Sequence, residues 1–172
     1  GGFTDCLLKN GAKLVYAVDV GYGQLDHKLR NDDRVVVMEK TNARYLEKSQ
    51  FEFEFDLAVV DVSFISVIKV LKAVVSLLKK SGTAIVLIKP QFEAGREKIG
   101  KGGIVKDPET HIDIIKTTIA ETDKIGLHIS DITYSPIKGP KGNIEFLAEF
   151  KKENVSNPSL DIDNIVRNAH IY

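Results

Sequence analysis

Short apolar runs that are typical of buried β-strands alternate along this chain with segments of helical character. The expected strands cover residues 14–18, 35–38, 57–60, 84–88, 127–133 and 144–150. Between the third and fourth runs, residues 66–78 carry apolar side chains at helical spacing, with lysines on the opposite face. Strands that alternate with helices form a doubly wound α/β sheet. The order of elements therefore predicts an α/β fold with a mostly parallel sheet.

The last two expected strands differ from the others because no helix separates them. Only the turn-rich segment 135–143 lies between them, so they should pair antiparallel at one edge of the sheet. This is the pattern of Rossmann-like methyltransferases, in which the last strand inserts antiparallel beside its neighbour. An NAD-binding domain normally continues with helical crossovers. The pattern favours S-adenosylmethionine over NAD as the cofactor.

Turn and cap residues divide the remaining segments. Helices are expected at 4–9, 24–30 and 161–170, and Asp107 and Pro108 should start a helix that ends at Lys124. Gly82 is expected to stop the helix over 66–78. The segment 90–106, seventeen residues with glycines at 95, 100, 102 and 103, is expected to be a mobile, functional loop.

The chain opens where a fold of this kind normally has the glycine-rich turn after its first, central strand. Residues 1–4 are Gly-Gly-Phe-Thr. Two halves of a sheet without their central strand would leave unpaired backbone edges. We therefore expect the sequence to be the downstream part of a longer protein. Residues 1–150 should form the methyltransferase domain and residues 151–172 a C-terminal extension.

Composition excludes several classes of protein. With 172 residues and 43% hydrophobic content, the chain can bury the core of one globular domain. A single cysteine excludes a disulfide framework and fits a cytoplasmic location. The histidines lack metal-ligand spacing, so no metal is expected. No apolar run approaches the roughly 20 residues that span a bilayer. A net charge of zero argues mildly against nonspecific nucleic-acid binding.

Two of the buried strands end in charged residues, Asp61 and Lys89. In an open parallel sheet, ligands bind in the crevice outside the carboxyl ends of the strands. A carboxylate and an ammonium there suit acid–base and electrostatic work, although a salt bridge between strand ends is the alternative. Glu145 precedes the last strand, where an alternating edge strand would present a polar residue in any case.

A second group of polar residues occupies the earlier strand exits. Gly1 and Gly2 begin a helix whose N-terminal amides could receive a carboxylate. Asp19 follows a strand and could accept both hydroxyls of a ribose, or it could simply cap the next turn. Asn42 can make the two-sided amide contact that adenine requires, but asparagines are common in turns.

Several longer motifs carry a resemblance to a known family. They are GGFTDCLL (1–8), AVDVGYGQL (17–25), EKTNAR (39–44), DVSFIS (61–66), KPQFE (89–93) and GPKGNIEF (139–146). The chain resembles the TlyA, or hemolysin A-like, family of FtsJ-like ribosomal RNA 2′-O-methyltransferases over roughly residues 1–150. The resemblance implies S-adenosylmethionine as cofactor and a ribose of ribosomal RNA, in a cytidine, as substrate. It also implies a small RNA-binding domain upstream, and ribosomal RNA or ribosomal subunits as partners.

The resemblance also assigns residues to the cofactor. It implies Asp19 as the ribose ligand and Asn42 with Ala43 along the adenine. The remaining expected cofactor contacts are Gly1, Gly2, Phe3, Thr4, Val20 and Asp61.

The family has a Lys-Asp-Lys-Glu tetrad, and three of its members match Asp61, Lys89 and Glu145. The first lysine has no counterpart here, so this segment alone is expected to be an incomplete enzyme. An amine accepts a proton only when uncharged, and neighbouring carboxylates favour the ammonium. The role expected for Lys89 is therefore to stabilise a developing alkoxide, with Asp61 and Glu145 positioning the lysine and the hydroxyl.

Basic residues in two loops form the expected RNA contacts. They are Arg96, Lys98, Lys101 and Lys106 in one loop and Lys138 and Lys141 in the other. Such a rim suits phosphate contacts, and ordinary solvated lysines are the alternative. Two other functions remain open: a membrane-active hemolysin, and a non-catalytic RNA-binding module with a methyltransferase fold.

Overall fold

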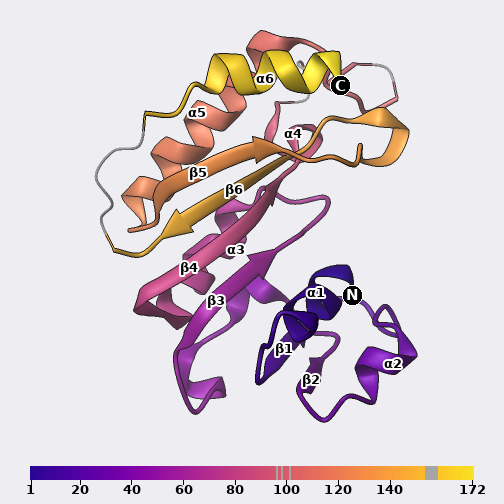
Figure 1. Ribbon diagram of the computed structural model, residues 1–172, viewed down its shortest axis with the longest axis vertical. Helices are drawn as coiled ribbons and strands as arrows, with labels where there is room; N and C mark the ends of the chain where they lie inside the picture. Colours follow the sequence, from indigo (N-terminus) through magenta and orange to yellow (C-terminus); the bar gives the residue numbers. More distant parts are fainter. Residues whose placement is uncertain (96, 98, 101, 154–158) are drawn as a thin grey trace. The chain divides into compact units, whose positions relative to one another are not determined.

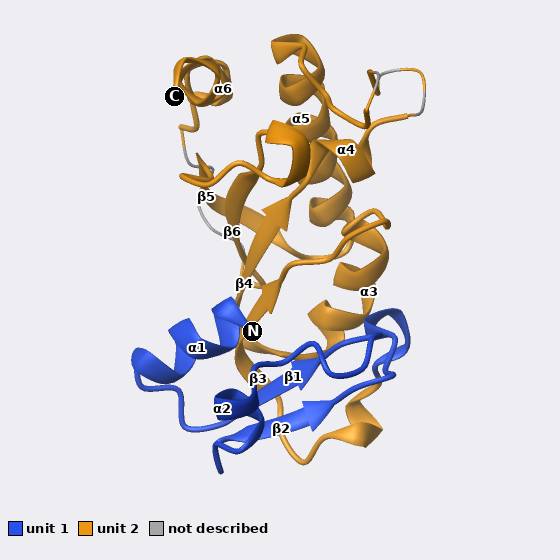
Figure 2. Ribbon diagram, turned by 90° about the vertical axis from the view of Figure 1, so that its right-hand side faces the viewer, with its two compact units in different colours: residues 1–46 blue, residues 47–172 orange. Residues whose placement is uncertain are grey.

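The computed structural model describes residues 1–95, 97, 99–100, 102–153 and 159–172. The chain divides into two compact units, residues 1–46 and residues 47–172 (Figure 2). Each unit contains its own hydrogen-bonded sheet. The expected division at residue 150 stays a prediction, but α6 (Ile162–Ile171) packs against α5 (Pro108–Lys124) and β5 (His128–Tyr134) of the second unit.

The first unit is built on two parallel strands. Its elements in order are α1 (Gly2–Lys9), β1 (Val15–Val18), α2 (His27–Arg30), β2 (Val35–Met38) and the short 3₁₀ helix η1 (Ala43–Tyr45). β1 pairs with β2 from Val15↔Val35 to Val18↔Met38. Both strands therefore end at the same edge. The expected helix over 24–30 is shorter than predicted because Asp26 caps it, accepting a hydrogen bond from the Lys28 amide.

The second unit carries a four-stranded sheet in the order β3-β4-β6-β5 (Figure 1). The strands are β3 (Phe55–Val60), β4 (Leu78–Ile88), β5 and β6 (Phe146–Lys151), joined by α3 (Ile68–Leu77), α4 (Pro90–Glu93), α5 and the 3₁₀ helices η2 (Lys48–Gln50) and η4 (Pro140–Gly142). β3 and β4 run parallel, whereas β6 lies antiparallel between β4 and β5. This confirms the predicted Rossmann-like methyltransferase pattern, in which the last strand is inserted antiparallel.

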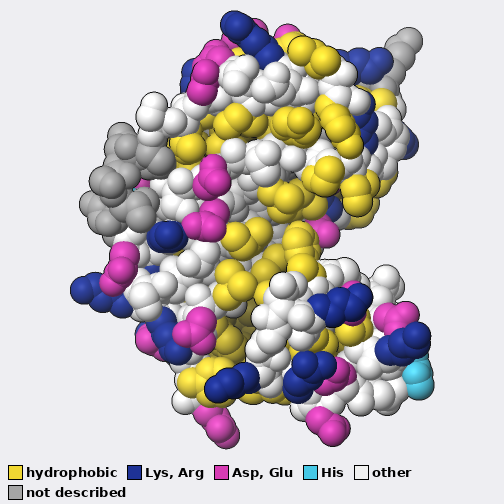
Figure 3. Space-filling view, in the orientation of Figure 1, with side chains coloured by type: hydrophobic (Ala, Val, Ile, Leu, Met, Phe, Trp, Pro, Cys, Tyr) yellow, Lys and Arg dark blue, Asp and Glu magenta, His cyan; other side chains and the backbone are white. Residues whose placement is uncertain are grey.

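Apolar faces of the helices and strands form the core of the second unit. Phe146, Phe150, Leu71 and Ile115 are fully buried. Helices α3 and α5 lie beside each other and cover the sheet (Figure 2). Figure 3 shows lysines and arginines mixed with acidic residues over the visible surface, as the zero net charge would suggest.

One local prediction was wrong. Gly82 does not stop the helix, because α3 ends at Leu77 and β4 begins directly at Leu78. Gly82 lies instead where the register of β3 and β4 shifts between Phe55 and Leu57. A Cβ on Gly82 would approach the Lys79 carbonyl oxygen to 2.9 Å, so glycine lets the strand bulge there.

The described part of the segment 90–106 contains some regular structure, and its expected mobility stays a prediction. It begins with α4, whose first residue, Pro90, favours a helix start. Further along, Gly100 and Ile104 form a β-bridge. By contrast, the α5 prediction is confirmed, since the Asp107 carboxylate accepts a hydrogen bond from the Thr110 amide at 2.9 Å.

Candidate active site

Lys89 and Asp61 meet at the carboxyl ends of β4 and β3. The Lys89 Nζ lies 2.6 Å from Asp61 Oδ1 and 3.2 Å from the Ser63 hydroxyl. The Lys89 side chain is only 12% exposed, whereas that of Asp61 is 44% exposed. The lysine is therefore held inside the sheet edge by a carboxylate that remains open to solvent. This geometry fits both alternatives, a salt bridge between strand ends and a catalytic pair.

Glu145 joins this edge through the antiparallel pairing of β4 and β6. The last paired rung is Ile88↔Phe146, so Lys89 and Glu145 are the next residues along the two strands. Glu145 is only 6% exposed, and its backbone carbonyl accepts a hydrogen bond from the Ser135 amide at 2.8 Å. A polar residue on the solvent-facing side of an alternating edge strand would be exposed. Its burial distinguishes Glu145 from that alternative.

Sequence reasoning missed two residues beside this pair. Phe64 is 91% exposed and has a left-handed backbone with φ of 64°, which is uncommon for a residue with a large side chain. Its ring centroid lies 5.0 Å from that of Phe92. Backbone strain and an exposed ring three residues after Asp61 are the kind of outlier that accompanies function. Gln91 is the other missed residue, since its buried amide donates to Glu145.

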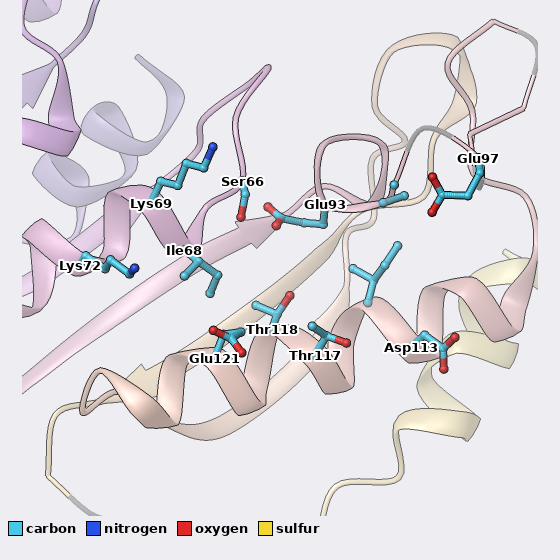
Figure 4. Close-up of a pocket in the computed structure, with 13 residues that line it drawn as sticks. Ser66, Ile68, Lys69, Lys72, Glu93, Glu97, Asp113, Thr117, Thr118 and Glu121 are labelled. Atoms are coloured by element: carbon cyan, nitrogen blue, oxygen red, sulfur yellow. The ribbon is translucent and has the colours of Figure 1, made fainter.

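Glu93, the last residue of the KPQFE motif, has a structural contact. Its carboxylate accepts a hydrogen bond from the Val67 amide at 2.7 Å, at the start of α3. Burial raises the pKa of Glu93 above its usual value, opposed by the hydrogen bonds from Val67 and Ser66. Glu93 lines a groove of about 500 Å³ between α3 and α5, together with Lys69, Lys72 and Glu121 (Figure 4). This glutamate ties α4 to α3.

The first unit places Asp19 and Asn42 at one edge. Asp19 follows β1, and its backbone carbonyl accepts a hydrogen bond from the Thr41 amide at 3.0 Å, next to Asn42. Both side chains are exposed and each fixes its own turn: Asp19 Oδ1 accepts from the Gly21 amide at 2.6 Å, and Asn42 Oδ1 accepts from the Arg44 amide at 3.1 Å. The local capping expected as the alternative is thus present, and it holds both groups at the strand exits.

The other expected cofactor residues lie in the first unit, with the exception of Asp61. Gly1 is the N-cap of α1, and its Cα lies against Leu25 and Leu29, where a Cβ would approach either side chain to 2.7 Å. Gly2, Phe3 and Thr4 form the first turn of α1. Val20 is 72% exposed, and Ala43 begins η1. Asp61 belongs to the second unit, and its expected part in cofactor binding stays a prediction.

The two basic loops are brought together by Asn143. Its side-chain oxygen accepts a hydrogen bond from the Val105 amide at 3.2 Å, and its amide nitrogen donates to the Gly103 carbonyl at 3.0 Å. Lys106 therefore lies next to the turn that carries Lys138 and Lys141. All three lysines are exposed and none forms an ion pair with another residue that the structure describes. Arg96, Lys98 and Lys101 lie outside the described residues.

A comparison with protein families decides the classification. The profile described as FtsJ-like methyltransferase matches residues 1–152. The chain belongs to the FtsJ-like methyltransferase family. In the part that the structure describes, no helix is long and apolar enough to cross a membrane, and no group of three or more His, Cys, Asp or Glu residues is arranged to hold a metal ion.

Individual relatives agree with this classification. A candidate rRNA methyltransferase, YqxC of Bacillus subtilis, is 47% identical over 99% of this chain and 63% of its own length. The 16S/23S rRNA (cytidine-2′-O)-methyltransferase TlyA of Mycobacterium tuberculosis is 44% identical over 85% of this chain and 54% of its own length. The solved structure of a candidate hemolysin from Streptococcus thermophilus superimposes with a TM-score of 0.95 at 46% identity, covering 99% of this chain and 63% of that one. The chain thus spans less than two thirds of the length of each of these relatives.

Proposed function

We propose that this FtsJ-like methyltransferase chain is the catalytic part of an enzyme that transfers a methyl group from S-adenosylmethionine to a ribose 2′-hydroxyl of ribosomal RNA, in a cytidine. The observation that carries the proposal is the Lys89–Asp61 pair, whose charged groups lie 2.6 Å apart at the ends of two parallel strands. The buried Glu145 lies next to the last paired residues of β4 and β6. The proposal places the protein in the cytoplasm, with ribosomal RNA or ribosomal subunits as its partner.

The polar groups of the first unit fit the cofactor's chemistry. Asp19 offers a carboxylate to the two ribose hydroxyls, and Asn42 offers an amide to adenine. The described N-terminal amides of α1 suit a carboxylate. When bound, S-adenosylmethionine supplies an electrophilic methyl group on a sulfonium sulfur.

The second unit supplies the groups that act on the hydroxyl. As the ribose oxygen attacks, negative charge develops on it, and the Lys89 ammonium can donate a hydrogen bond to that oxygen. A preorganised charge of this kind in a partly buried site stabilises the transition state more than the ground state. Asp61 fixes the ammonium, and Glu145 can accept the hydrogen bond of the hydroxyl and orient it. Phe64, exposed three residues after Asp61, offers a ring on which a nucleobase could stack.

Product analysis tests this function. The full-length protein, incubated with methyl-labelled S-adenosylmethionine and ribosomal RNA, should yield a 2′-O-methylnucleoside after nuclease digestion and mass spectrometry. A base-methylated nucleoside would contradict the assigned chemistry. Binding of RNA without transfer would favour the non-catalytic RNA-binding module, and leakage of liposomes would favour the hemolysin.

Asp19→Ala should weaken S-adenosylmethionine binding by about 1.5–3 kcal/mol, the scale of a hydrogen bond to a charged acceptor. Asp19→Asn keeps an oxygen for the Gly21 amide and should lose less. Calorimetric titration measures both, and Asp33→Ala, at an exposed aspartate of the same unit, is the control. Unchanged affinity in Asp19→Ala would remove Asp19 from the cofactor site.

Replacing Lys106, Lys138 and Lys141 together by glutamine should weaken RNA binding and flatten its salt dependence, without changing cofactor affinity. For every phosphate that the protein no longer neutralises, the slope of log affinity against log salt should become shallower by about 0.7–0.9. The control variant replaces Lys80 near the start of β4, Lys124 at the end of α5 and Lys151 at the end of β6. If both triple variants showed the same salt slope as the wild type, the basic loops would be solvated surface.

A further inference from the structure

The carboxylate of Glu145 is enclosed by residues from two segments. Gln91 Nε2 donates a hydrogen bond to Glu145 Oε1 at 2.9 Å. On another side lies Gly139, where a Cβ would approach the same oxygen to 2.2 Å and the carboxyl carbon to 2.7 Å. Glu145 Oε2 accepts no hydrogen bond from the residues that the structure describes. One carboxylate oxygen is thus held by Gln91.

Gln91 is placed for this contact by the element that follows Lys89. It is the second residue of α4, whose start is set by Pro90, and only 9% of it is exposed. Its own side-chain oxygen is buried without a hydrogen-bond partner among the described residues. A buried unpaired oxygen costs free energy of folding. A hydrogen bond from the Gln91 N–H to a charged acceptor can offset this cost. The only described acceptor of that N–H is Glu145.

The turn that carries Gly139 is also fixed. The Gly139 amide donates to the Asn143 carbonyl at 2.8 Å, and Asn143, 3% exposed, also holds Gly103 and Val105. Gly139 thus approaches the carboxylate from a turn that these hydrogen bonds hold together. Backbone strain is not the reason for glycine there, since Gly139 has φ of −68°.

We propose that Gln91 is a positioning residue, which orients the Glu145 carboxylate toward the reacting hydroxyl with Gly139 as the opposite wall. The inference rests on the proposed function, in which Glu145 orients the ribose hydroxyl. Gln91 itself does not touch the substrate. Its loss should therefore lower the rate of transfer and leave substrate binding nearly unchanged.

Three variants of the full-length protein test this role. Gln91→Met keeps the volume and removes the N–H, so kcat should fall roughly 10- to 100-fold, with KM for both substrates within about twofold of the wild type. Gln91→Glu keeps the shape but adds a second carboxylate, which can donate to Glu145 only when protonated. The activity of this variant relative to the wild type should therefore rise as the pH falls from about 8.5 to about 6. The Gln91→Met ratio should stay flat over the same range.

Gly139→Ala tests the opposite wall by an independent route. Alanine tolerates φ of −68°, so the backbone need not change, but the new methyl must displace the flexible carboxylate. We expect a loss of kcat comparable to that of Gln91→Met, with a thermal midpoint close to that of the wild type.

The outcomes separate this inference from the function on which it rests. If the wild type transfers methyl groups to ribose while Gln91→Met keeps kcat within twofold, or if the Gln91→Glu ratio does not change with pH, the positioning role is wrong. If the wild type fails to transfer, the proposed function is wrong and the inference falls with it.

Discussion

Lys89→Ala in the full-length protein should lower kcat for ribose methylation by about 10²–10³, because removing a preorganised donor at a developing oxyanion has effects of this size. Affinity for S-adenosylmethionine should be nearly unchanged, since Lys89 acts on the nucleophile. Lys89→Arg should fail as well, because the guanidinium is larger and planar and cannot replace a compact ammonium 2.6 Å from Asp61. Transfer of a tritiated methyl group to ribosomal RNA measures the rate, and calorimetry measures the affinity.

A matched control for this prediction is Lys80→Ala, at an exposed lysine near the start of the same strand, β4. It should keep wild-type activity. If both lysine variants retained transfer within a few-fold of the wild type, Lys89 would be a structural member of a salt bridge at the strand ends.

Acid should destabilise the second unit through His111. This residue is fully buried, and its Nδ1 lies 3.0 Å from Nε2 of His170 on α6. Burial and the neighbouring His170 lower the pKa of His111 from 6.5 to about 4, partly opposed by the Val105 backbone and by Asp107. The unfolded chain therefore binds a proton below pH 6.5 that the folded protein takes up only near pH 4. Over this window the free energy of unfolding should fall by roughly 2–3 kcal/mol.

The His111→Gln variant should lose this part of the pH dependence, whatever its stability at neutral pH. Denaturant unfolding at pH 7.5 and at about pH 5 gives the difference for each protein. His27→Gln, at an exposed histidine of the first unit, should keep the wild-type difference. A His111→Gln protein that lost as much stability in acid as the wild type would show that other groups are responsible.

Much of the fold was predictable because local pattern and tertiary structure agree. The apolar run 35–38 became β2 without change, and the Asp107–Pro108 cap began α5 as expected. The antiparallel last strand followed from the missing helix between two strands. Gly82 misled because a glycine after an amphipathic run predicts a helix stop equally well whether the chain leaves into a loop or into a bulged strand. Only the pairing of β4 with β3 distinguishes the two.

The site was predictable where it depends on strand ends. Asp61 and Lys89 both follow apolar runs, and parallel pairing brings them within 2.6 Å of each other. The contacts of Gln91 and Asn143 could not be predicted in this way. Each joins segments about forty or more residues apart, Gln91 to Glu145 and Asn143 to Gly103. Their partners depend on how the loops fold back, which no local spacing encodes. The exposure of Phe64 was hidden for a related reason, since an aromatic residue in an apolar run normally predicts burial.

We propose that the full-length protein to which this chain belongs methylates a ribose of ribosomal RNA. The test is to map 2′-O-methylated nucleotides in ribosomal RNA from cells that carry the gene, lack it, or carry the Lys89→Ala form. We predict a ribose methylation, at a cytidine, that is present only with the wild-type gene. Identical ribose methylation in all three ribosomal RNA samples would contradict the claim.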